Sequence, residues 1–310
     1  MTSSFTTPAE ATATPPRPPR NQAVEALRIL SAFGIVEFHG GGALAGYFYT
    51  GLIVFIALSP MLDCYYNWER LRPIRSLAKT LLIPWLFWSV IYAGFALLRH
   101  KPVLLPENPV LAVLMGTSPH LWFLPFIFLV LVALGLAKSR VSPSIAFLAA
   151  ALAVLLILAT AGTWRPLSLG WPLPLPQWAH AIGAVFAGIA IGLTTRAGKL
   201  LVPGVALVAI GLVIAIAAGI PGISFTYGLG IPLTTAAVFL GRRWWPANLS
   251  VQAVSECMMG VYLVHIILLS IAGAFVTKGS LLQAVIAFSA SLGLVFAARR
   301  ILPATRLILG

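Results

Sequence analysis

Charge is the scarcest property of this sequence. Only 9% of its 310 residues are charged, and 7 of them are Asp or Glu. A soluble domain of ordinary composition has about a quarter of its residues charged. Here 60% of residues are hydrophobic and the mean hydropathy is +0.98. These values exclude a soluble fold and indicate that lipid surrounds most of the chain.

Cysteine and metal-ligand patterns are also scarce. The two cysteines, Cys64 and Cys257, cannot build a disulfide framework, and no Cys or His pair has the spacing of a zinc site. We therefore expect no metal site and no permanently bound cofactor.

The first 22 residues form a tract of Thr, Ala and Pro that ends in Arg17 and Arg20. The tract lacks the apolar core and the small-residue cleavage site of a signal peptide. We predict a disordered cytoplasmic tail over residues 1–22 and one integral-membrane domain over residues 23–310, with no soluble domain attached.

Long apolar runs dominate the rest of the chain. About 20 apolar residues are needed for a helix to cross a bilayer, and ten runs approach this length: 24–41, 46–63, 77–97, 120–137, 143–161, 177–195, 200–219, 222–241, 253–274 and 281–301. The run around Pro221 can be divided differently, so nine or eleven helices are alternatives. The predicted fold is an all-α, polytopic transmembrane bundle of about ten helices.

The basic residues test this topology independently, because Lys and Arg in short loops stay on the cytoplasmic side. With the N-terminus inside and ten crossings, 16 of the 20 Lys and Arg lie inside and 4 lie outside, and both termini are cytoplasmic. The outer four are Arg99, Lys101, Arg165 and Lys278. Topology therefore accounts for the net charge of +13, and no nucleic-acid partner is expected.

The first predicted span contains unusual ionisable residues. Arg28 and His39 are 11 residues apart, which on a helix is three turns plus about 20° and a rise of about 16 Å. They share one face with Glu25, whereas Glu37 is turned about 200° from His39. Ionisable residues inside a span are functional candidates. The structural alternatives are an Arg28 that reaches the cytoplasmic rim and a His39 that packs against another helix.

These residues and four further segments resemble the integral-membrane acyltransferase-3 family. The acid, arginine and histidine of the first span match its first helix. The segments VFIALS at 54–59, RLRPIRSLAK at 70–79, HLWFLP at 120–125 and GVYLVH at 260–265 follow in the family order. Two positions depart from the family pattern, in which glycine usually stands where this chain has Ile29 and Pro60.

The resemblance implies that the chain O-acylates a glycan or glycolipid, with acyl-coenzyme A, in the first instance acetyl-coenzyme A, as co-substrate. His39 is then the general base, and Arg28 acts beside it as the second catalytic residue. The coenzyme phosphates bind cations on the inner side, for which we assign Arg28, Arg72, Arg75 and Lys79. The alternative for the cations of this loop is that they only set the membrane topology and bind no ligand.

Four other residues complete the predicted site. His120 and Trp122 are expected to bind the acceptor, although an interfacial aromatic belt is the alternative for the tryptophan. Tyr262 and His265 join Glu25 as supporting residues, and a packing hydrogen bond is the alternative for His265.

The predicted protein is thus a multi-pass acyltransferase of the inner (cytoplasmic) membrane that modifies acceptors at the outer face. A transporter or flippase for a polysaccharide or a lipid-linked intermediate is the competing interpretation, because ten helices and a midplane histidine would serve it equally well.

Overall fold

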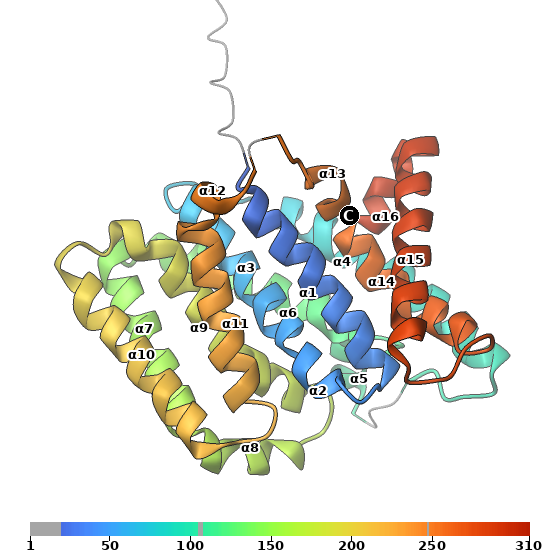
Figure 1. Cartoon of the computed structure of the whole chain (residues 1–310), viewed down its shortest axis with the longest axis horizontal. Helices are drawn as coiled ribbons and strands as arrows, with labels where there is room; N and C mark the ends of the chain where they lie inside the picture. The colour runs from blue at the N-terminus through green and yellow to red at the C-terminus, as the bar shows by residue number, and fades with distance from the viewer. Residues whose placement is uncertain (1–19, 105–107, 247) are drawn as a thin grey trace, which may run out of the picture.

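The computed structural model describes residues 20–104, 108–246 and 248–310, and this part of the chain is helical without a β-strand (Figure 1). The all-α prediction is confirmed. Most of the predicted N-terminal tail, residues 1–19, lies outside the described residues.

Each of the ten predicted spans contains a helix. The long helices are α1 (Gln22–Gly40), α3 (Thr50–Asn67), α4 (Ile74–Leu98), α6 (Phe123–Lys138), α7 (Pro143–Ala159), α9 (Leu175–Leu193), α10 (Leu201–Ala218), α11 (Ser224–Phe239), α14 (Met258–Ala272) and α15 (Leu281–Ile301). The short ones are α2 (Ala45–Phe48), α5 (Pro109–Met115), α8 (Ala161–Leu169), α12 (Gly241–Trp244), α13 (Gln252–Ser255) and α16 (Arg306–Leu309). Single 3₁₀ turns cover Pro119–Trp122, Thr194–Arg196, Gly198–Leu200 and Pro303–Thr305.

Six helical segments of the described chain are long and apolar enough to cross a membrane, and a seventh is possible if the bent pair α7–α8 is one span. The other helices at predicted spans are less typical: α1 carries Glu25, Arg28 and Glu37, and α11 and α14 have 16 and 15 residues. The multi-pass helical architecture is therefore confirmed, and the number of ten crossings stays a prediction.

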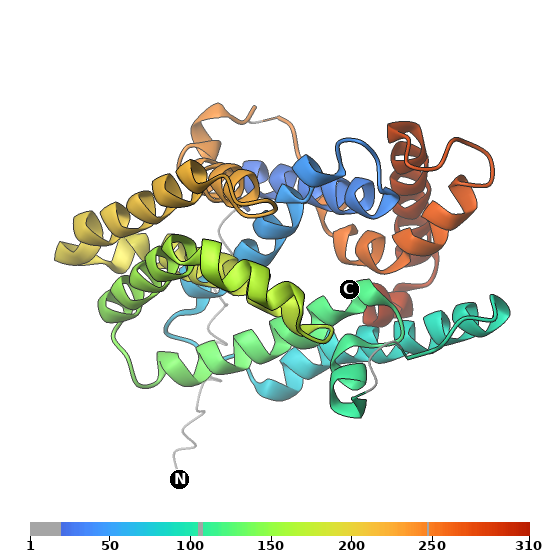
Figure 2. The same cartoon turned by 90° about the horizontal axis from the view of Figure 1, so that it is seen from below.

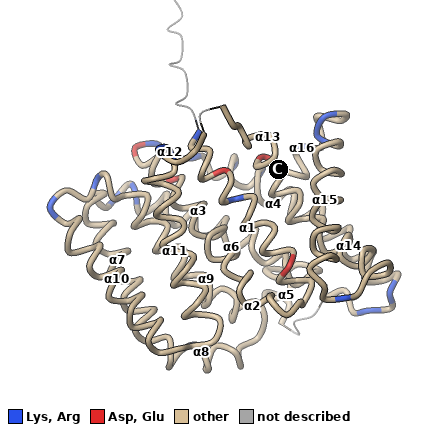
Figure 3. Tube along the Cα trace, in the orientation of Figure 1, with Lys and Arg blue, Asp and Glu red and all other residues tan. Residues whose placement is uncertain are grey.

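The basic residues gather mainly along the edge of the bundle where α12 and the upper end of α15 lie, with a smaller group at the opposite end beside α14 (Figure 3). Under the predicted topology the first of these groups faces the cytoplasm and the second faces outside. The side chain of Asn21 helps to order the edge beside α12. It accepts a hydrogen bond from Ala23 N, which caps α1, and donates to Ala237 O at 2.9 Å and Val238 O at 3.2 Å near the end of α11.

Helix α1 lies in the middle of the bundle and packs against α3, α11, α14 and α15 (Figure 1). Seen from below, α4 and α6 lie side by side in a layer on the other side of the molecule from α1 (Figure 2). A glycine permits the close crossing of α1 and α3, because a Cβ at Gly51 would lie only 2.5 Å from Ser31 O. The site residues of α1 are thus held by neighbours on several sides.

Two segments that lie between predicted spans contain helices. The segment 98–119 includes α5, which begins after the capping side chain of Asn108. The segment 162–176 includes most of α8, which bends by 71° from α7. The length of apolar runs did not predict α5 or α8, because a short helix does not need an apolar run long enough to span the membrane.

Candidate active site

His39 lies in the last turn of α1, and Gly41, the residue after the helix, has the left-handed conformation with φ 73°. Its Nδ1 is 2.9 Å from Ile35 O, one turn earlier in the same helix. The His39 residue is exposed, although Ile35, Val36 and Glu37 before it are buried. The imidazole is therefore both anchored at one nitrogen and accessible.

His265 of α14 contacts His39 directly. His265 is 0% exposed, its Nδ1 is 2.6 Å from Tyr262 O, and its Nε2 is 3.1 Å from His39 Nδ1. A carbonyl oxygen can only accept, so Nδ1 of His265 carries a proton and Nε2 of the neutral ring is an acceptor. His39 Nδ1–H then donates to Ile35 O and to His265 Nε2. This assignment leaves Nε2 of neutral His39 unprotonated, as a base requires.

His120 is the third member of the cluster. It belongs to the 3₁₀ turn before α6 and is buried, and its ring centre is 5.2 Å from that of His265 and 6.2 Å from that of His39. Its Nδ1 is 2.9 Å from Ser118 Oγ, and its carbonyl accepts a hydrogen bond from the Tyr262 hydroxyl. Its Nε2 is buried without a partner among the described residues. If the Ser118 hydroxyl donates to Nδ1, this Nε2 carries a proton that is available to a substrate.

Aromatic side chains surround the three histidines. Tyr92 of α4 has its ring centre 4.8 Å from that of His120, and its hydroxyl donates to Leu263 O at 2.8 Å.

Within the described part of the chain, no group of three or more His, Cys, Asp or Glu is arranged to hold a metal ion.

Arg28 lies near the N-terminal end of α1 and is paired. Its Nη1 is 3.1 Å from Glu25 Oε2 and 3.4 Å from Ser255 Oγ, and the Ser255 hydroxyl also donates to Glu25. Glu25 is 5% exposed. Through Ser255 the pair connects α1 to α13. Arg28 therefore makes a structural contact and is not simply an arginine that reaches the membrane surface.

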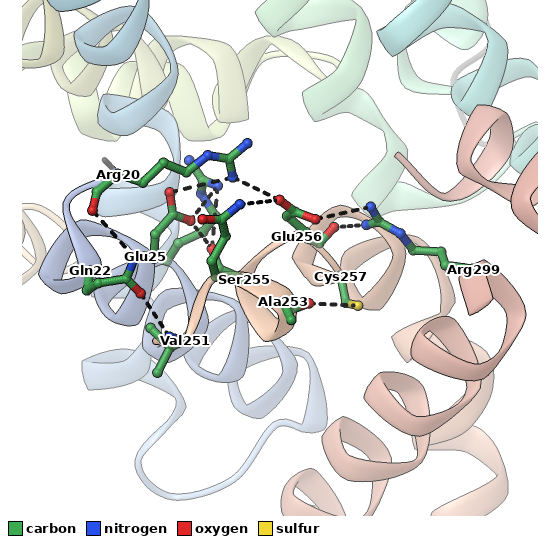
Figure 4. Close-up of polar contacts among 11 residues, drawn as sticks. Arg20, Gln22, Glu25, Val251, Ala253, Ser255, Glu256, Cys257 and Arg299 are labelled. Atoms are coloured by element: carbon green, nitrogen blue, oxygen red, sulfur yellow. Dashed lines mark hydrogen bonds and ion pairs between the residues drawn. The ribbon is translucent and has the colours of Figure 1, made fainter. Parts of the chain in front are cut away.

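The same end of α1 holds a second set of charges (Figure 4). Glu256 is 3.2 Å from Arg20 and 3.8 Å from Arg299, whose guanidinium also donates to Glu256 O. Gln22 accepts a hydrogen bond from Val251 N at 2.8 Å. These contacts fix the start of α1 against α13 and α15.

The remaining predicted cations are free of such contacts. Arg72, Arg75 and Lys79 lie just before α4 and in its first two turns, and all three are exposed. Among the described residues they make no ion pair or side-chain hydrogen bond. Their charges are therefore not neutralised by acidic side chains of the described residues.

Trp122 is buried and contacts aromatic neighbours on α6, with ring centres 5.6 Å from Phe126 and 6.2 Å from Phe123. It lies two residues after His120 in the chain. Any contact with an acceptor stays a prediction.

A model of the acyltransferase-3 family, described as an acyltransferase domain, matches residues 21–300. The chain belongs to this acyltransferase family. No curated protein and no solved structure matches the chain significantly.

Membership of the acyltransferase-3 family makes the protein a multi-pass membrane acyltransferase. The matched region contains every site residue predicted from the sequence. The sequence did not predict that His39, His120 and His265 would converge. It also did not predict the contact of Ser118 with His120 or the contact of Ser255 with Glu25. Ser118 stands two residues before His120, and this close spacing is the only local signal for its role.

Proposed function

We propose that this acyltransferase moves an acyl group, in the first instance acetyl, from cytoplasmic acyl-coenzyme A to a hydroxyl of a glycan or glycolipid at the extracytoplasmic face. The observation that carries the proposal is the 3.1 Å contact between His265 Nε2 and His39 Nδ1. It favours a neutral His39 with its Nε2 lone pair directed away from its protein partners.

In the proposed reaction His39 Nε2 takes the proton of the acceptor hydroxyl while the hydroxyl oxygen attacks the thioester carbonyl carbon. A tetrahedral oxyanion forms. When it collapses, the carbon–sulfur bond breaks, and the coenzyme thiolate leaves and takes the proton from the His39 imidazolium. The products are the acylated acceptor and free coenzyme A, so atoms and charges balance.

The two other histidines support separate parts of this step. Neutral His265 accepts from Nδ1–H of His39, and this hydrogen bond strengthens when His39 becomes an imidazolium. His120 contributes a hydrogen bond from its unpartnered Nε2–H to the developing oxyanion. In this proposal His265 is a positioning residue, and His120 contacts the substrate.

The donor reaches the site from the inner face. Arg72, Arg75 and Lys79 are exposed there and suit the coenzyme phosphates. Arg28 lies about 16 Å from His39 along α1, a length of the order of an extended pantetheine arm. Phosphates held at the rim are therefore compatible with a thioester beside His39. A transporter does not require a proton-accepting histidine such as His39 held by a second histidine. The family match also favours acyl transfer.

The test measures transfer of labelled acetyl from acetyl-coenzyme A to the glycan and lipid fractions of membranes that contain the protein. His39→Ala should lower the rate by about 10²- to 10⁴-fold. His39→Gln should fail as well, because an amide forms hydrogen bonds but does not accept a proton at neutral pH. Both variants should still bind the coenzyme. Transfer at nearly the wild-type rate by a folded His39→Gln protein contradicts the base assignment.

A further inference from the structure

Among the described residues, Ser118 makes the one hydrogen bond to the His120 ring. Ser118 Oγ is 2.9 Å from His120 Nδ1, and His120 Nε2 has no partner. The two residues are 7% and 3% exposed, so bulk water does not solvate either group. The direction of this single hydrogen bond therefore decides which nitrogen of neutral His120 carries the proton.

A count of the buried hydrogen-bonding groups favours the serine hydroxyl as the donor. In the described ranges Ser118 Oγ contacts no hydrogen-bonding atom other than His120 Nδ1. If Nδ1–H donated to this oxygen, the hydroxyl proton would lack an acceptor and Nε2 would lack a donor, so two buried groups would be unsatisfied. If the hydroxyl donates, only Nε2–H is unsatisfied. Because an unsatisfied buried polar group is costly, the second arrangement is the more stable one.

The backbone on both sides of Ser118 fixes this geometry. Ser118 is extended, with φ −144° and ψ 139°, and its carbonyl accepts a hydrogen bond from Leu121 N at 3.0 Å, which closes the 3₁₀ turn that carries His120. The hydroxyl of Thr117 donates to Ser89 O of α4 at 2.5 Å. The turn is thus tied to α4, and Ser118 is held beside the imidazole.

The His120 ring itself has little room to rotate. The ring of Tyr92 lies against it with centres 4.8 Å apart and an interplanar angle of 78°, and the ring of Tyr262 does so at 5.5 Å and 67°. The Tyr262 hydroxyl also donates to the backbone oxygen of His120. Close packing on two sides keeps Nδ1 directed at Ser118.

His39 has the opposite arrangement of proton and lone pair. Its Nδ1 is 2.9 Å from Ile35 O and 3.1 Å from His265 Nε2, and both of these atoms accept. The proton of neutral His39 is therefore on Nδ1 and the lone pair is on Nε2. The rings of His39 and His120 have their centres 6.2 Å apart. Two neighbouring imidazoles thus offer one Nε2 that accepts and one Nε2 that donates.

We infer that Ser118 is a positioning residue that holds neutral His120 in the Nε2–H form by donating its hydroxyl proton to Nδ1. The use of this Nε2–H by the developing oxyanion rests on the proposed function, whereas the position of the proton does not. Negative charge on an oxygen bound at Nε2 strengthens the Ser118 hydrogen bond in turn, because hydrogen bonds in a chain polarise one another. The serine therefore contributes to the rate through His120.

The position of the proton is measured by solid-state NMR of the full chain in lipid vesicles, with isotope-labelled histidine. The signals of His120 are those that vanish in His120→Gln. In the wild-type protein Nε2 should be protonated, and Nδ1 should be an unprotonated nitrogen that accepts a hydrogen bond.

A matched pair of variants isolates the hydroxyl. Ser118→Thr keeps it, and the extended backbone suits a β-branched side chain, so both His120 signals should stay. Ser118→Val has nearly the same shape without the hydroxyl, so the Nδ1 signal should move and an Nδ1–H form should become detectable. The control Thr117→Val removes the neighbouring hydroxyl, which bonds to Ser89 O and not to His120, and should leave the His120 signals unchanged.

Acetyl transfer gives a second measurement, with labelled acetyl-coenzyme A at saturation and the glycan and lipid fractions of the membrane as acceptors. The rate should be about three- to tenfold lower in Ser118→Val than in Ser118→Thr, the value of one neutral hydrogen bond. KM for acetyl-coenzyme A should be equal in the two proteins. Ser118→Ala makes the same change with a smaller side chain and should match Ser118→Val, and equal melting temperatures show that the fold is intact.

Two results overturn the inference: a wild-type His120 that is protonated at Nδ1, or identical His120 signals in the Thr and Val variants. The spectra are recorded without acetyl-coenzyme A. The expected spectra together with equal rates in the two variants would therefore contradict the oxyanion role in the proposed function, and not the effect of Ser118 on the proton of His120.

Discussion

His265 Nε2 and His39 Nδ1 are 3.1 Å apart, although the two residues are separated by 226 positions in the chain. The contact joins α14 to the last turn of α1. It converts a histidine that looks isolated in the sequence into one member of a hydrogen-bonded pair.

This contact predicts a positioning role for His265. His265→Leu removes the acceptor for His39 Nδ1–H and should lower kcat by about 10- to 100-fold, the value of a hydrogen bond to a charged group. KM for acetyl-coenzyme A should stay nearly constant. His265→Gln can place an amide oxygen near the lost Nε2 and should recover much of kcat. Equal kcat values for His265→Leu and the wild-type protein would mean that His265 only packs against its neighbours.

Arg28 is predicted to act on both donor binding and stability. Arg28→Ala should weaken acetyl-coenzyme A binding by about tenfold through loss of a charge-assisted contact. It also leaves the buried Glu25 with only the longer, 3.9 Å contact to Arg20 as an ion pair, so the melting temperature should fall.

A double variant separates the two effects. Arg28→Ala combined with Glu25→Gln removes the uncompensated carboxylate and should restore thermal stability. Donor affinity, measured by calorimetry in detergent, should stay low. Recovery of affinity together with stability would mean that Arg28 serves only the structure.

A second buried ion pair predicts a purely structural effect. Lys138 of α6 donates to the Asp63 carboxylate of α3 and, at 3.1 Å, to Asn67 O, and the two side chains are 2% and 6% exposed. Asp63→Leu or Lys138→Met alone leaves a buried charge unpaired and should destabilise the fold by about 3–5 kcal/mol. The double variant should melt closer to wild type in a fluorescence-detected thermal assay. Additive losses in the double variant would argue against a direct coupling.

The topology can be tested by thiol labelling, since both native cysteines are buried and should be silent. Leu169→Cys and Lys278→Cys should react with an impermeant reagent added to intact cells, whereas Trp244→Cys should react only after the membrane is opened. All three positions are exposed on the protein. Reaction of the cysteine at 244 in intact cells would contradict the predicted orientation.

The sequence by itself determined the local features of this protein. Each predicted apolar run contains a helix, because a segment in lipid must satisfy its own backbone hydrogen bonds. The Arg28–Glu25 pair was equally predictable, since residues three positions apart lie on one face of a helix. The ordered motifs also identified the acyltransferase-3 family, which the match over residues 21–300 confirms.

Only the tertiary structure decided which helices bring their polar side chains together. His39, His120 and His265 come from three distant segments, and their meeting depends on how α1, α6 and α14 pack. Helical periodicity gives the face on which a residue lies but not the helix that this face contacts. The sequence also did not predict the stack of His180 on Tyr49 or the bend between α7 and α8. Both arise from packing between segments and not from any one apolar run.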